Sequence, residues 1–155
     1  MTRPTALGLK VPDFSAQSTA GPVKLSDYAG RRVVLYFYPK DNTPGCSTES
    51  ADFAKLHGEI TARNAVVFGV SRDSLKSHSS FRTKLGLPYH LISDPDETLC
   101  NLFDVIGMKK MYGRDVRGVI RSTFVIDDKG RLAHEWRGVK VPGHAAAVLE
   151  KLENE

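Results

Sequence analysis

The sequence predicts an α/β domain in which a mixed central sheet is flanked by helices. Over residues 33–105, short apolar runs rich in β-branched residues alternate with segments whose apolar residues recur at helical spacing. Two further apolar runs, at 121–126 and 132–136, enclose the turn sequence DDKG, as in a β-hairpin, and a helical segment follows at 143–152. Alternating strands and helices favour parallel pairing and a hairpin adds antiparallel strands, so the sheet should be mixed.

The elements before residue 90 have identifiable starts and stops. The N-terminal region should form a β-hairpin extension from LKVPDFSAQ and PVKL, followed by a turn at LSDYAGR. A buried strand is predicted at 33–38, a helix from Cys46 to about Arg63, and a second buried strand at 65–70. Ser74 is a helix N-cap, and that helix should end at Gly86 because Pro88 prevents its continuation.

A short strand at 89–92 precedes a strong helix signal, Asp94-Pro95-Asp96-Glu97. This pattern predicts an N-cap, a proline at the first helical position and a capping-box glutamate. Residues 107–118 have no clear period and are predicted to be an exposed loop. The whole order, βαβ and then ββα, is that of a thioredoxin-like domain.

Length and composition exclude several function classes. The 155 residues suit one domain, so we expect residues 1–155 to form a single one. The net charge of +4 is mild and the basic residues are scattered, so no nucleic-acid partner is expected. Since no apolar run has membrane length and the N-terminus lacks a signal-peptide core, we expect no membrane association and a cytoplasmic location. Neither the two cysteines nor the five histidines have metal-ligand spacing, so no metal or other cofactor is expected, and the histidines should be surface or partly buried residues.

The stretch VVLYFYPKDNTPGCSTESAD, residues 33–52, marks the place for chemistry. A buried strand ends at Pro39, a polar loop follows, and Cys46 stands where a helix begins. The first turn of a helix carries unpaired N–H groups and the positive end of the helix dipole, which favour a thiolate. Phe53 lies seven residues further along, on the same helix face, so the sulfur should point into a recess.

These residues resemble a known family. PKDNTPGC, residues 39–46, matches the peroxiredoxin active-site pattern of a proline, three residues, a threonine, two residues and a cysteine. TPGC followed by Glu49 is similar to the peroxiredoxin Q branch, also called bacterioferritin comigratory protein. The likeness extends through LISDPDETLCNLFDV, RSTFVID and the final helix, which covers most of the chain.

The resemblance implies a thiol-dependent peroxidase that reduces hydrogen peroxide and alkyl hydroperoxides through a sulfenic acid. Cys46 would be the peroxidatic cysteine, and Arg121 would hold the thiolate and the peroxide. Thr43 would hydrogen-bond the peroxide, and Pro39 would wall the pocket. Glu49 would orient Arg121 or merely interact with the helix dipole. Without the resemblance, Cys46 could be an inert buried thiol, Thr43 a cap and Arg121 a surface residue.

The sequence departs from the branch in its resolving cysteine. Relatives place this cysteine at the position of Ala51 or at that of Arg82, and neither is a cysteine here. Cys100, the only other thiol, is expected to be a buried bystander, with a two-cysteine mechanism that uses it as an atypical resolver as the alternative. We therefore expect a one-cysteine mechanism with an external thiol.

The sequence leaves the reductant and the assembly open. Thioredoxin, glutaredoxin with glutathione or another thiol could reduce the sulfenic acid, and the protein could be a monomer or a weak homodimer. Two other classes compete with a peroxidase. A thiol–disulfide oxidoreductase is disfavoured because no C-x-x-C motif is present, and a non-catalytic domain could retain the fold alone.

Overall fold

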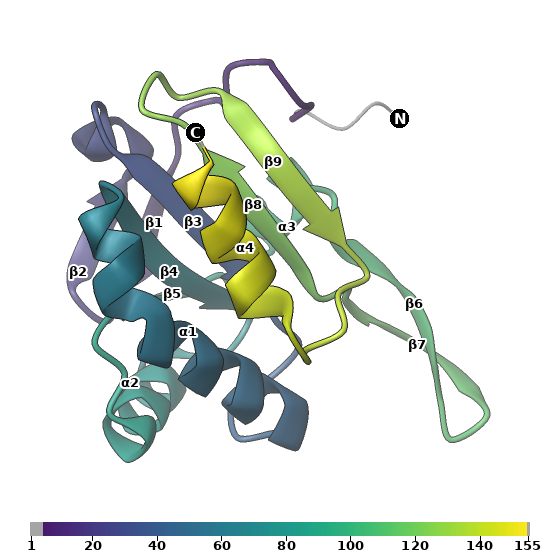
Figure 1. The fold of residues 1–155 in the computed structure, drawn as a ribbon. Coiled ribbons are helices and arrows are strands. Elements are labelled where there is room, and N and C mark those ends of the chain that lie inside the picture. The colour runs from purple at the N-terminus through teal and green to yellow at the C-terminus, as the bar shows by residue number, and fades with distance from the viewer. Residues whose placement is uncertain (1–4, 155) are drawn as a thin grey trace.

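In the computed structural model, which describes residues 5–154, a seven-stranded sheet carries helices on both faces (Figure 1). The strand order is β2-β1-β5-β4-β3-β8-β9. The strands of this sheet are β1 (Ser15–Ser18), β2 (Gly21–Lys24), β3 (Arg32–Phe37), β4 (Ala65–Ser71), β5 (His90–Ser93), β8 (Ser122–Ile126) and β9 (Leu132–Arg137). The helices are η1 (Leu25–Tyr28, a 3₁₀ turn), α1 (Pro44–Ala62), α2 (Leu75–Leu85), α3 (Thr98–Leu102) and α4 (His144–Glu153). No helix among these residues has the length and hydrophobicity needed to cross a membrane.

The strand directions confirm the predicted mixed sheet. Strands β3, β4 and β5 run parallel, whereas β8 is antiparallel to β3 and β9 is antiparallel to β8. At the other edge, β1 and β2 form an N-terminal hairpin that pairs with β5 through β1, which confirms the predicted extension. Because the parallel strands end at one edge of the sheet, the segments after β3 and β4 lie close together there.

Both faces of the sheet are buried, which explains the continuous apolar run in β3. Alternate residues of that strand enter two hydrophobic clusters, with Tyr36 in one and Phe37 in the other. Buried residues of α1, α2 and α4 complete the cluster of Tyr36, and residues of α3 complete that of Phe37. Figure 1 shows α1 and α4 side by side on one face of the sheet, with α3 behind β8.

A hydroxyl network attaches α1 to the sheet. Tyr89 Oη donates to the carbonyl oxygen of Ser50 at 2.7 Å, and Tyr36 Oη donates to Ser50 Oγ at 2.9 Å. Gly69 in β4 leaves room for this contact, since a Cβ at position 69 would lie 2.7 Å from Tyr36 Oη and 2.8 Å from Leu91 Cδ2. The helix that carries Cys46 is therefore held by buried hydrogen bonds.

Gly69→Ala is expected to lower the free energy of unfolding by about 1–3 kcal/mol, because the added methyl group overpacks a filled core. Urea denaturation followed by circular dichroism measures the change. Gly58→Ala in α1 is the matched control. A Cβ at position 58 meets nothing within 4 Å, and alanine replaces glycine in a helix, so this change should stabilise the protein by about 0.5–1 kcal/mol. Equal effects of the two substitutions would contradict the steric argument.

The prediction of a loop at 107–118 is wrong. The segment forms a separate two-stranded hairpin, β6 (Ile106–Met111) and β7 (Arg114–Val119), which projects from the body (Figure 1). Its turn residues, Tyr112 and Gly113, have φ values of 53° and 79°, as a type I′ turn requires. Because most of β7 faces solvent, the hairpin lacks the hydrophobic alternation that reveals a half-buried strand.

The predicted helix start at Asp94-Pro95-Asp96-Glu97 is also wrong in its details. The helix α3 begins only at Thr98, and Glu97 is its N-cap in the left-handed region, with φ 61°. Asp94 still caps the helix, since its carboxylate accepts from the backbone N–H groups of Leu99 and Cys100 at 3.0 and 2.8 Å. The Glu97 side chain forms ion pairs with Arg72 and Arg117 and thereby ties the hairpin to the end of β4.

Candidate functional site

Cys46 is the third residue of α1, at the edge where the parallel strands end. Thr43 is the extended N-cap of this helix, and Pro44 occupies the first helical position, where its missing N–H costs nothing. The Cys46 residue is only 1% exposed, and it belongs to the same hydrophobic cluster as Phe53. The prediction of a sulfur that points inward from a helix start is thus confirmed.

Arg121 reaches this sulfur from a distant part of the sequence. It directly precedes β8, and the pairing of Ser122 with Phe37 brings it beside the end of β3. Its Nη2 donates to Cys46 Sγ at 3.3 Å. Gly45 leaves room for this approach, because a Cβ at that position would make a tight contact of 3.3 Å with the same nitrogen. The sheet register therefore places a permanent positive charge beside the sulfur.

Glu49 is the third member of the group. One helical turn after Cys46, it accepts a hydrogen bond on Oε1 from Arg121 Nη1 at 2.6 Å. Its other carboxyl oxygen, Oε2, is buried and has no partner among residues 5–154. Burial raises the pKa of Glu49 to about 7, although Arg121 opposes this shift. Burial disfavours the charged guanidinium, but Glu49 and Cys46 outweigh it and raise the pKa of Arg121.

Thr43 and Pro39 lie in the short segment that leads into α1, and both are half-buried. The Thr43 hydroxyl donates to the carbonyl oxygen of Lys40 at 2.8 Å, so its lone pairs stay available to accept a hydrogen bond. Pro39 follows Tyr38, whose N–H makes the last bond to β4, at the Val70 carbonyl oxygen. This proline stands where pairing with β4 ends, as its missing donor predicts.

A buried ion pair fixes the loop between β3 and α1. Asp41 Oδ2 lies 2.8 Å from His78 Nδ1 and accepts from Ser77 Oγ at 2.8 Å, while Asp41 Oδ1 accepts from Tyr38 Oη at 2.6 Å. Burial opposes ionisation of Asp41, but its bonds to His78, Tyr38 and Ser77 outweigh it and lower the pKa of Asp41. The loop is thus tied to α2 immediately before Cys46.

Sequence reasoning missed this pair and misjudged two histidines. His78 is fully buried and His144 is 6% exposed, so the prediction of surface or partly buried histidines is wrong for both. The sequence did contain a signal for His78, since it lies three residues before the buried Phe81 on one face of α2. His144 Nε2 lies 2.7 Å from Thr123 Oγ1, and burial, aided by Arg121, lowers the pKa of His144 to about 4.

Asp41, His78 and Asp73 form a group whose ligand-type atoms all lie within 4.8 Å of one another, close enough to hold a metal ion. These atoms already bond to protein groups. Asp73 Oδ2 accepts from the N–H of Asp41 and from Ser71 Oγ, and His78 Nε2 lies 2.9 Å from the carbonyl oxygen of Ile92. The hydrogen bonds therefore account for the cluster.

Cys100 lies away from the site. It is fully buried in the hydrophobic cluster on the opposite face of the sheet from Cys46, and both cysteines are free. Burial and the neighbouring Asp94 carboxylate raise the pKa of the Cys100 thiol far above its usual range. The expectation that Cys100 is buried is confirmed, and such a thiol is a poor nucleophile.

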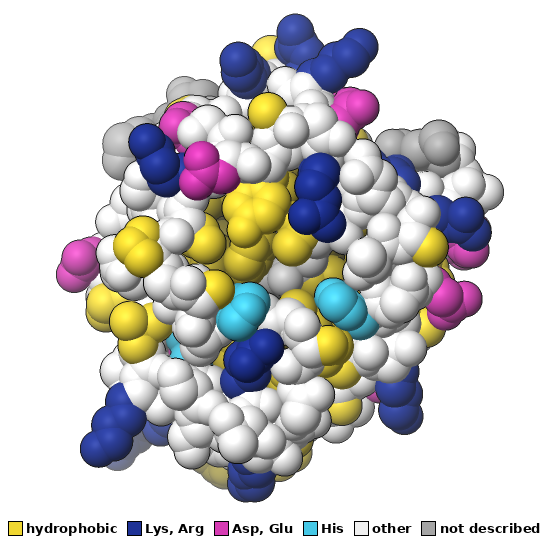
Figure 2. Space-filling view, turned by 90° about the vertical axis from the view of Figure 1, so that its left-hand side faces the viewer, with side chains coloured by type: hydrophobic (Ala, Val, Ile, Leu, Met, Phe, Trp, Pro, Cys, Tyr) yellow, Lys and Arg dark blue, Asp and Glu magenta, His cyan; other side chains and the backbone are white. Residues whose placement is uncertain are grey.

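The charged side chains on the face shown in Figure 2 are scattered. This face is the left-hand side of Figure 1, away from the Cys46 end of α1, and basic side chains are spread over it with acidic ones among them, around a hydrophobic hollow. No continuous basic stripe crosses this face, in line with the mild charge of +4.

Comparisons with known proteins agree with this geometry. The AhpC/TSA family model matches residues 7–135. Peroxiredoxin Bcp of Bacillus subtilis is 47% identical over 149 residues, which cover 96% of this chain and 95% of that protein. A cysteine-to-serine variant of PrxQ from Xylella fastidiosa superposes with a TM-score of 0.91 at 46% identity, covering 97% of this chain and 96% of that one.

A structure of the Xanthomonas campestris bacterioferritin comigratory protein, described in connection with its alkyl peroxide reduction activity, has a TM-score of 0.89 at 45% identity. It covers 96% of this chain and 98% of the other. These similarities extend over almost the whole chain, including the helix start at Cys46 and the strand that follows Arg121. The chain therefore belongs to the AhpC/TSA family and is a peroxiredoxin of the Bcp or PrxQ branch, a thiol-dependent peroxidase.

Proposed function

We propose that the chain reduces hydrogen peroxide and alkyl hydroperoxides by a one-cysteine mechanism with Cys46 as the peroxidatic cysteine. The observation that carries this proposal is the 3.3 Å hydrogen bond from Arg121 to Cys46 Sγ in a site that is 1% exposed. A guanidinium and the helix N-terminus both favour the thiolate, which is the nucleophilic form. Alkyl peroxide reduction by the Xanthomonas campestris relative supports the wider substrate range.

The other site residues divide the remaining tasks. Arg121 neutralises charge on the sulfur and on the oxygen that departs from the peroxide. Thr43 accepts a hydrogen bond from the peroxide O–H, Pro39 limits the entry of water, and Glu49 orients Arg121 through its 2.6 Å bond. The sulfenic acid that results is then reduced by an external thiol such as thioredoxin or glutaredoxin with glutathione.

Two observations support an external reductant over an internal resolver. The residue at position 82 is an arginine whose Nε donates to the carbonyl oxygen of Tyr89, and position 51 is an alanine, so both resolver positions of the branch lack a thiol. Cys100 lies in the cluster on the other face of the sheet. A disulfide needs its two Cα atoms within about 7 Å, so a bond between Cys46 and Cys100 would require local unfolding.

Intact-mass measurement after addition of a slight excess of hydrogen peroxide tests this proposal. We expect wild type to gain one oxygen atom as a sulfenic acid, which dimedone traps. Cys46→Ser should gain none, and Cys100→Ser should behave as wild type. Loss of two hydrogen atoms by wild type, prevented by Cys100→Ser, would identify a disulfide and overturn the one-cysteine mechanism. Rapid oxygen uptake by Cys46→Ser would overturn the assignment of Cys46.

A further inference from the structure

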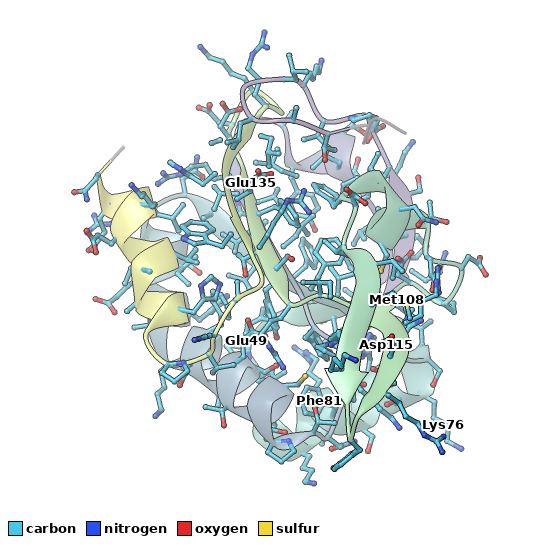
Figure 3. The ribbon with its side chains drawn as sticks, turned by 90° about the vertical axis from the view of Figure 1, so that its right-hand side faces the viewer. Glu49, Lys76, Phe81, Met108, Asp115 and Glu135 are labelled. Carbon is cyan, nitrogen blue, oxygen red and sulfur yellow. The ribbon has the colours of Figure 1, made fainter. Side chains whose placement is uncertain are left out.

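The candidate site contains one permanent cation and two groups that become anions. Arg121 donates through Nη2 to Cys46 Sγ and through Nη1 to Glu49 Oε1, at 3.3 and 2.6 Å. Cys46 and Glu49 are each 1% exposed, and the Arg121 side chain is 17% exposed. Figure 3 shows Glu49 in the interior, with Met108 and Asp115 marking the projecting hairpin. Water is thus largely excluded from all three groups.

Charge balance in this site favours a single remaining proton. If Cys46 and Glu49 were both ionised, the trio would carry one uncompensated negative charge, and burying such a charge is costly. Glu49 Oε2 gives independent evidence. A buried carboxylate needs hydrogen bonds on both oxygens, yet Oε2 has no partner among the described residues. Leaving a charged oxygen unpaired in the interior costs more than leaving a neutral hydroxyl there, so a carboxylic acid, with Oε1 as its carbonyl oxygen and Oε2 as its hydroxyl, is favoured.

We propose that Cys46 and Glu49 share one proton, so that the Cys46 thiolate coexists with a neutral Glu49, which gives its proton to the oxygen leaving the peroxide. This inference rests on the proposed role of Cys46 and adds to the orienting role of Glu49. The guanidinium links the two groups, because it can neutralise only one anion at a time. The two ionisations therefore belong to the pair and not to either residue alone.

The reaction balances with this single proton. The thiolate sulfur attacks the terminal oxygen of the hydroperoxide, an S–O bond forms and the O–O bond breaks. Sulfur is oxidised to the sulfenic acid, whose oxygen keeps its own hydrogen. The departing oxygen takes the electron pair of the O–O bond and the proton of Glu49, and it leaves as water or an alcohol. Glu49 is then a carboxylate paired with Arg121 while Cys46 is a neutral sulfenic acid. Solvent returns the proton when the thiolate is regenerated.

The charged groups around the trio are consistent with this balance. Asp52, on the next turn of α1, adds negative charge and helps burial to raise the pKa of Glu49 to about 7. Burial raises the pKa of Tyr89 and lowers that of His144 to about 4, so both are neutral at neutral pH. Lys109 of β6 is a cation, but it is half-exposed, so solvent screens its charge.

An infrared measurement tests the shared proton without any turnover. Reduced wild type at neutral pH should show the C=O stretch of a buried carboxylic acid, and Glu49→Gln should lack it. Glutamine keeps an oxygen that can accept from Arg121. Asp52→Asn, which removes a carboxylate from the same helix one turn away, should retain the band. If the band is absent from wild type, or is lost in Asp52→Asn but not in Glu49→Gln, the proposal is wrong, whether or not the protein reduces peroxides.

The pH dependence of the second-order rate of Cys46 oxidation tests the proton transfer. For wild type we expect a bell-shaped profile, because the rate requires one proton on the pair and falls when that proton is lost. Glu49→Gln should lose the alkaline limb, and its plateau should be lower by roughly 10²-fold, as for removal of a general acid. Asp52→Asn should keep the limb, moved to lower pH because a nearby negative charge is gone.

If Glu49 only orients Arg121 and transfers no proton, the pH profile should differ from this expectation. Glu49→Gln would then keep the wild-type profile in shape, and a persistent alkaline limb in this variant would overturn the proton transfer. If peroxide does not oxidise Cys46 in wild type, the proposed function is wrong. The infrared band would still decide whether Cys46 and Glu49 share a proton.

Discussion

Replacing Arg121 by methionine is expected to slow the oxidation of Cys46 by hydrogen peroxide by about 10²–10³-fold, the usual cost of removing a donor that stabilises developing charge. The guanidinium contacts both Cys46 Sγ and Glu49 Oε1, so its loss removes the cation from the thiolate and the partner from the carboxyl group. The thiolate then becomes less populated at neutral pH, and the leaving oxygen loses its electrostatic support. Stopped-flow oxidation of the reduced protein measures the rate, and the ultraviolet absorbance of the thiolate measures its population.

Two variants sharpen this prediction. Arg121→Lys keeps the positive charge but lacks the planar fork that contacts the sulfur and the Glu49 carboxyl group together, so its rate should lie between those of wild type and Arg121→Met. Arg117→Met makes the same substitution in β7, where Arg117 pairs with Glu97 outside the trio of Cys46, Glu49 and Arg121. Cys46 of this variant should be oxidised at the wild-type rate. A wild-type rate for Arg121→Met would show that the observed contact has no part in the chemistry.

The local part of the site could be predicted from sequence because each step depends on neighbouring residues. The proline at residue 39 ends the strand pairing, Pro44 fits the first turn of a helix, and Cys46 follows within that turn. The inward direction of the sulfur followed from its spacing to Phe53. Short-range rules of this kind need no knowledge of how distant segments pack.

Arg121 shows where local rules stop. Its place beside Cys46 depends on the antiparallel register of β8 on β3, in which Ser122 faces Phe37. No spacing in the sequence encodes that register, and only the family resemblance points to this arginine. The 3.3 Å contact with the sulfur now gives it a physical basis.

The errors have the same origin. The β6–β7 hairpin lacks hydrophobic alternation because it is mostly exposed, and its turn is a Tyr-Gly pair in place of the usual Asn-Gly. Glu97 fits a capping box by pattern, yet its carboxylate pairs with two arginines from other elements, and the helix begins at Thr98, three residues after the predicted first position. In both cases a tertiary contact or solvent exposure outweighed the local signal.

Replacing His78 by alanine is expected to lower the free energy of unfolding by about 3–5 kcal/mol, the cost of removing one partner from a buried ion pair. His78 Nδ1 lies 2.8 Å from the Asp41 carboxylate and Nε2 lies 2.9 Å from the Ile92 carbonyl oxygen. Both partners are hydrogen-bond acceptors, so the imidazole ring is held on both sides. The substitution leaves the Asp41 carboxylate, which is 4% exposed as a residue, without its buried partner.

Urea denaturation at neutral pH measures this loss, with His57→Ala as the control. His57 is half-buried on α1, and its contact with Thr61 is 3.5 Å long, so its replacement should change stability by only about 0.5 kcal/mol. His78→Gln, which keeps one donor, should fall between the two. Since the pKa of folded Asp41 is lowered, the stability that Asp41 contributes is present above its unfolded pKa and is lost as pH falls through the lower folded value. The difference between wild type and His78→Ala should therefore shrink in acid. A loss in His78→Ala no larger than that in His57→Ala would mean that the loop before Cys46 is held by its other contacts alone.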